Sequence, residues 1–95
     1  MSPEEAVIRG ERARQFLEDP FVTDAFESCK KEILALWEAT PARDVDAREW
    51  LWKLYQAQLR FESIFKGYVD SGKIAADQLR HKQSIPQRIK NAWAT

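Results

Sequence analysis

One long apolar stripe, within residues 47–72, governs how this chain can fold. On a helix, residues spaced alternately by three and four positions lie on one face. The stripe consists of Ala47, Trp50, Leu54, Ala57, Phe61, Ile64 and Tyr68, and a neighbouring row consists of Leu51, Tyr55, Phe65 and Val69. Together the two rows widen the apolar arc to about half of the helix circumference, against ~100° for an ordinary surface helix. A single partner helix is not enough to cover such an arc.

Start and stop signals divide the rest of the chain into further helices. Ser2 and Asp19 are N-cap residues, each followed by a proline at the first helical position. Pro41 stops the second helix, Asp46 caps the third, and Gly72 is the natural residue to end it. The predicted helices cover residues 3–18, 20–39, 47–71, 73–82 and 86–94, the last as a short helix or a docking tail.

These elements predict a single all-α domain over residues 1–95, built on an antiparallel helical hairpin of the second and third helices. A loop of about seven residues suits antiparallel neighbours. A short N-terminal helix and short C-terminal helices complete the fold. The first helix carries a seam of small residues, Ala6, Gly10 and Ala13, that lets another helix approach closely. The second helix presents Val22, Ala25, Phe26, Cys29, Ile33, Leu36 and Trp37 within an arc of about 120°.

Composition excludes several classes of protein. With 44% hydrophobic and 32% charged residues, the chain has enough apolar mass for a core and enough charge for solubility. No apolar run approaches the ~18 residues that span a bilayer. The acidic N-terminus is unlike the basic and apolar start of a signal peptide. We therefore expect a cytoplasmic protein with no membrane partner.

The 15 basic and 15 acidic residues are distributed unevenly along the chain. Residues 1–28 carry seven acids against three arginines, and residues 73–95 carry five lysines and arginines against one aspartate. A head-to-tail contact between two copies, or a basic tail offered to an acidic partner, would use this asymmetry. Solvated charged faces are the simpler interpretation.

Side chains able to perform catalysis are sparse. Cys29 lies within an apolar stripe and we expect it to be buried as a small hydrophobe. The only histidine, His81, lies in a basic segment, so a Cys–His nucleophile is improbable and no multi-histidine metal site exists. Paired carboxylates have a simpler role as helix caps. We expect no enzyme activity, no cofactor, no metal site and no small-molecule substrate.

Binding to other macromolecules is the better interpretation. Helix-mediated association is expected to use Trp50, Trp52, Leu54, Leu59, Phe61, Phe65 and Tyr68, because aromatic side chains dominate interface energetics. Trp52 and Leu59 form a third row that the hairpin alone leaves exposed. Three interpretations remain: these residues form the contact of a homo-oligomer, they bind a larger protein partner, or they form only the core of a monomer.

Contact with nucleic acid or an acidic partner is the second possibility. The residues that would make it are Lys73, Arg80, His81, Lys82, Arg88, Lys90 and Trp93. Against nucleic acid, the pI is about 6.6, where a basic footprint exceeds about 9.

Three segments, LEDPFVTDAF (17–26), LWEATPARDVDAREWLWKLY (36–55) and DSGKIAADQL (70–79), give the chain a pattern that resembles small helical-hairpin proteins of tailed bacteriophages and prophages. The resemblance implies a viral protein that works by binding, in virion assembly or on a host target such as a defence nucleoprotein. It also implies the bacterial host cytoplasm, or the virion, as its location. Residues 80–95 lie outside the resemblance.

Overall fold

Three helices make up the chain in the computed structural model, which describes the backbone of residues 1–94 and the side chains of residues 1–82. They are α1 (Pro3–Glu18), α2 (Pro20–Ala39) and α3 (Val45–Ala94). No strand occurs within the described backbone. The chain is therefore all-α, and α1 and α2 have the predicted bounds.

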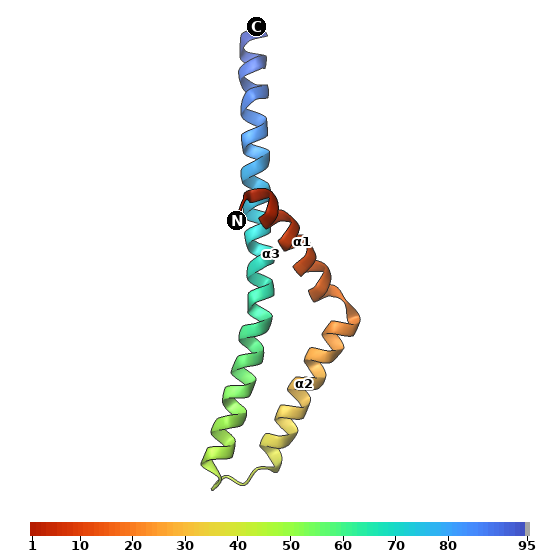
Figure 1. The fold of residues 1–95 in the computed structure, drawn as a ribbon, viewed down its shortest axis with the longest axis vertical. Helices are drawn as coiled ribbons and strands as arrows, with labels where there is room; N and C mark the ends of the chain where they lie inside the picture. The colour runs from red at the N-terminus through yellow and green to blue at the C-terminus, as the bar shows by residue number, and fades with distance from the viewer. Residues whose placement is uncertain (95) are drawn as a thin grey trace.

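The predicted caps begin α1 and α2. The Ser2 hydroxyl accepts a hydrogen bond from the Glu5 amide at 3.1 Å, and Asp19 Oδ1 accepts one from the Phe21 amide at 2.9 Å. Asp19 ends α1 and starts α2, with Pro20 at the first position of α2. Because Asp19 has an extended backbone, the chain changes direction there, and α1 and α2 form a bent arm beside α3 (Figure 1).

The third helix differs from the prediction. It is one helix of 50 residues, so the predicted end at Gly72 and the separate helices over 73–82 and 86–94 are wrong. The helix begins at Val45 rather than at residue 47, and Asp44, not Asp46, caps it by accepting a hydrogen bond from the Ala47 amide at 3.2 Å. No glycine has a positive φ, which shows that Gly72 does not act as a C-terminal cap. Residues 73–83 are mostly strong helix formers, and they carry the helix onward. The described backbone stays helical across residues 84–87 as well.

The main packing contact is between α1 and α3, where the sequence predicted α2 and α3. Gly10 and Gly72 meet at the crossing: a Cβ added to Gly10 would lie 2.8 Å from the Tyr68 carbonyl oxygen and 2.9 Å from Gly72 Cα. Gly10 and Ala13 are buried, as expected of the small-residue seam. α2 runs back antiparallel to α3 but lies further from it along its length (Figure 1).

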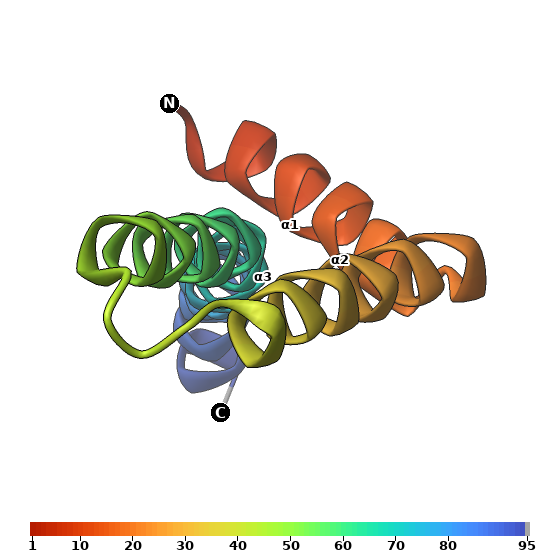
Figure 2. The ribbon, with the colours of Figure 1, turned by 90° about the horizontal axis from the view of Figure 1, so that it is seen from below.

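The resulting molecule is a rod with a thin core. It measures 78 × 25 × 20 Å, and its radius of gyration of 21.8 Å compares with ~12 Å for a compact domain of this length. α1 lies across one side of the α2/α3 pair (Figure 2), and the C-terminal part of α3 projects beyond α1 (Figure 1). Among the described side chains, the buried apolar set is Ala13, Ile33, Leu51 and Ala75. The three helices therefore leave many of their large apolar side chains exposed.

Candidate protein interface

A largely exposed apolar row runs along α3 between residues 50 and 64. We call this row the α3 stripe; its members are Trp50, Leu54, Ala57, Phe61 and Ile64, at spacings of four and three residues. Trp50 is 61% exposed, Phe61 49% and Leu54 38%. This spacing is that of a helix seam that packs against another helix. The α3 stripe is thus a largely exposed helix surface, in which the Phe61 ring makes an edge contact with Phe26 of α2.

Polar side chains occupy part of the surface that α3 turns towards α2. Gln58 donates a hydrogen bond from Nε2 to the Phe26 carbonyl oxygen at 2.8 Å. Glu62, with a side chain only 13% exposed, forms an ion pair with Lys30 at 3.3 Å. These contacts, together with the edge contact between Phe61 and Phe26, hold α2 beside α3 and leave most of the α3 stripe exposed.

An aromatic cluster, which includes Phe61 of the α3 stripe, joins the three helices. Phe16 of α1 lies with its ring centroid 4.6 Å from that of Phe65 and 6.1 Å from that of Phe26. Phe61 contacts Phe26 and Phe65 at centroid distances of 6.2 and 5.1 Å. The Arg9 guanidinium stacks 4.0 Å from the centre of the Tyr68 ring. Of the predicted interface residues, Phe65 and Tyr68 are therefore half-buried by contacts within the chain.

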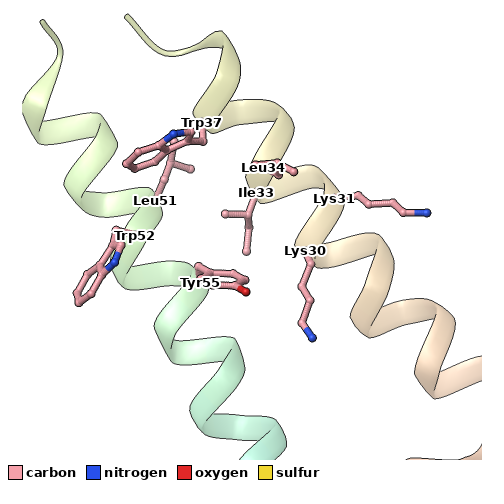
Figure 3. A pocket seen from close by; sticks show the side chains of 8 residues that line it. All are labelled: Lys30, Lys31, Ile33, Leu34, Trp37, Leu51, Trp52 and Tyr55. Atoms are coloured by element: carbon pink, nitrogen blue, oxygen red, sulfur yellow. The ribbon is translucent and has the colours of Figure 1, made fainter. Parts of the chain in front are cut away.

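An apolar groove runs along the other side of the α2/α3 pair, with a volume of about 340 Å³ (Figure 3). Its lining consists of Lys30, Lys31, Ile33, Leu34, Trp37, Leu51, Trp52 and Tyr55. Trp52 is 55% exposed, and Leu59, which follows it by seven residues, is half-buried. The two helices thus offer apolar surface on both sides of their shared plane.

Helical periodicity places the remaining exposed residues. Ile33 and Leu51 are the buried residues at the centre of the α2/α3 contact. Leu34 follows Ile33 by one position and Trp52 follows Leu51 by one position, so each is rotated about 100° around its helix from the buried residue, towards the groove. Residues rotated from the buried residue in the opposite direction lie on the side away from the groove. On α2 these are Ala25, Cys29, Glu32 and Leu36, which we call the α2 row, and all four are exposed. The α2 row and the α3 stripe therefore share one side, opposite the groove.

Cys29 corrects one expectation from the sequence. Its thiol is exposed rather than buried, because α2 turns only the Val22, Phe26, Ile33 and Trp37 part of its apolar arc towards its neighbours. Leu34, which also lines the groove, lies outside that arc and was missed. The one feature of the sequence that could have indicated a role for Leu34 is that it is a second large aliphatic residue directly after Ile33.

The predicted basic set is only partly described. Lys73, Arg80, His81 and Lys82 are exposed on α3. Arg80 forms an ion pair with Asp77 one turn earlier, which offsets part of its charge. Arg88, Lys90 and Trp93 lie outside the described side chains. Within residues 1–82, no group of three or more histidines, cysteines or carboxylates is placed to hold a metal ion.

The strongest electrostatic cluster lies at the end of α1 that joins α2. Arg14 donates hydrogen bonds to both Glu11 oxygens and, at 2.6 Å, to Glu18 Oε2. The hydrogen bonds from Arg14 lower the pKa of Glu11, and those carboxylates raise the pKa of Arg14. All three side chains are exposed, so this network stabilises α1 locally rather than forming a reactive site.

Comparison with protein-family models, curated proteins and solved structures finds no match for this chain. A helix long and apolar enough to cross a membrane is absent from the described residues.

Proposed function

We propose that this chain is a non-enzymatic protein that acts by helix-mediated protein–protein association, as a structural or assembly component of a phage particle. The observation that carries the proposal is the open apolar surface on both sides of the α2/α3 pair. Exposed Trp50, Trp52 and Phe61 are the residue types that dominate binding energy at interfaces. Contiguous apolar surface of this kind marks interaction sites on soluble proteins.

The total surface supports the same proposal. The chain exposes 7709 Å², about 2,000 Å² more than a globular monomer of 11.1 kDa. A standard protein–protein interface buries about 800 Å² on each partner. The excess exposed area is therefore more than twice the area that one such interface buries on each partner. A partner would supply the apolar burial that the thin intrachain core lacks.

The phage setting comes from the sequence resemblance over residues 17–26, 36–55 and 70–79. A small rod with two apolar sides suits repeated contacts in a particle. The bacterial cytoplasm and the virion are the corresponding locations.

Site-specific photo-cross-linking of the full chain, inside the cells that produce it, tests the proposal. A photoreactive amino acid replaces Leu54 in the α3 stripe or, as a matched control, Gln56 on the exposed outer side of the same helix. We expect protein adducts from position 54 and few from position 56. Absence of adducts at position 54, or equal adducts at both positions, contradicts the proposal.

Cross-linking and DNA binding separate the two alternatives. Adducts restricted to a host protein would favour a phage-encoded inhibitor that binds a host protein or nucleoprotein. A weak nucleic-acid binder using Arg80 and Lys82 would instead show DNA binding that falls with salt and is lost in alanine variants of both residues.

A further inference from the structure

We infer that the occupant of the α3 stripe is the α2 row of a second copy of this chain, so that two copies form a reciprocal dimer. This inference rests on the proposed function and names the partner. Each copy carries both halves of the contact, exposed on the same side of its α2/α3 pair. A two-fold axis parallel to the helices places each α3 stripe on the other copy's α2 row, which makes the contact twice. The result is a four-helix arrangement over residues 50–64 of α3 and 25–36 of α2.

The side of α3 that carries the α3 stripe is already covered by a helix of the same chain further along. Towards its C-terminus, the same side of α3 continues through Tyr68, Gly72 and Ala75, and there α1 covers it. α1 then diverges from α3 towards Pro20, so it does not lie over the N-terminal part of α3 (Figures 1 and 2), where the exposed members of the α3 stripe lie. A helix of a second copy would occupy the place that α1 vacates, over about 22 Å of α3.

Charge distinguishes the α2 row from other partners for the α3 stripe. The outer edge of the stripe carries Lys53 and Arg60, both exposed. Lys53 forms an ion pair with Glu49 one turn earlier at 3.5 Å, and because both side chains are exposed this pair is weak. The α2 row contains Glu32, and Asp24 lies at its outer edge, both exposed. Within residues 1–82 the side chains of Arg60, Glu32 and Asp24 make no ion pair, so they can pair with another copy.

The alternative two-fold arrangement is less favourable. An axis perpendicular to the helices would place the α3 stripe on the α3 stripe of the other copy. Lys53 and Arg60 would then face the same basic residues, and like charges placed together at an interface weaken association. Stacking α3 on α2 brings opposite charges together instead. Charge complementarity therefore selects both the partner and its orientation.

Charge-reversal variants of the full chain test this arrangement by sedimentation equilibrium. One variant combines Lys53→Glu with Arg60→Glu, and the other combines Asp24→Lys with Glu32→Lys. We expect the dimer dissociation constant to rise at least about tenfold in each, because each creates like-charge contacts in both halves of the interface. An equimolar mixture of the two variants, and the chain with all four reversals, should each restore the dimer.

Matched reversals away from this side, Glu27→Lys and Lys66→Glu, should leave the dissociation constant unchanged. All reversed side chains are exposed, so circular dichroism should report the same helicity for every variant. A wild-type chain that stays monomeric overturns the inference, as does failure of the mixture and the fourfold variant to dimerise. A monomer that still gives adducts with another protein at position 54 would overturn only the dimer and leave the proposed function standing.

Discussion

Gly10 and Gly72 lie where the backbones of α1 and α3 approach each other too closely for side chains. Gly10→Ala gains about 1 kcal/mol of helix propensity. The new Cβ, however, would lie 2.8 Å from the Tyr68 carbonyl oxygen, so the helices must move apart. We expect a lower melting temperature by circular dichroism. Gly67→Ala is the matched control: its Cβ meets no atom within 4 Å, so stability should rise by up to about 1 kcal/mol. A rise in both variants would contradict this packing.

Arg14 offers a second test at the level of single residues. Hydrogen bonds from Arg14 lower the pKa of Glu11, so this contribution to helix stability is present above the carboxylate's ordinary pKa and is lost as pH falls through the lowered value. The Arg14→Gln substitution should return the pKa of Glu11 towards its ordinary range, and an NMR titration measures this change. An unchanged Glu11 titration would show that Arg14 is not the cause.

The seam of small residues in α1 could be predicted from the sequence because it is a local periodic pattern. The role of Gly72 could not. A glycine near the end of an apolar pattern is a common helix-end signal. Only the contact with Gly10, more than sixty residues away, shows that its missing side chain makes room for another helix.

At the level of helices, the ion pair between Lys30 and Glu62 links α2 to α3. Glu62 is the more buried partner, so Lys30→Met leaves a carboxylate without its cation in a poorly solvated position. We expect it to reduce the free energy of unfolding by about 1 kcal/mol. Glu62→Leu should cost less, because it removes the buried charge itself. Urea denaturation of both variants measures the difference, and a larger cost for Glu62→Leu would contradict this interpretation.

The apolar arcs of the helices were predictable, but which part of each arc packs within the chain was not. Cys29 and Ile33 both lie within the α2 arc, so the periodic pattern predicts burial for both equally. In the fold, Ile33 is buried and Cys29 is exposed, and which of the two packs depends on how α2 lies against α3, a contact between segments distant in the sequence. The α3 stripe stays largely exposed for the same kind of reason: Gln58 and Glu62 make the polar contacts with α2, and the stripe adds one edge contact, between Phe61 and Phe26.

At the level of the whole molecule, the exposed thiol of Cys29 reports on the proposed dimer. It belongs to the α2 row, which the α3 stripe of a second copy would cover. We expect its reaction with a thiol reagent to be fast in dilute protein and to slow as the protein concentration rises. The Lys53→Glu, Arg60→Glu variant should react at the fast rate throughout. A rate independent of concentration in the wild type would contradict coverage of this row.

The rod shape and thin core leave apolar surface exposed, and we propose that self-association covers it. Sedimentation equilibrium of the unmodified full chain, between about 1 and 100 µM, measures self-association directly. We expect the mass to rise with concentration to twice the 11.1 kDa of the chain. A mass of one chain at every concentration would contradict the dimer.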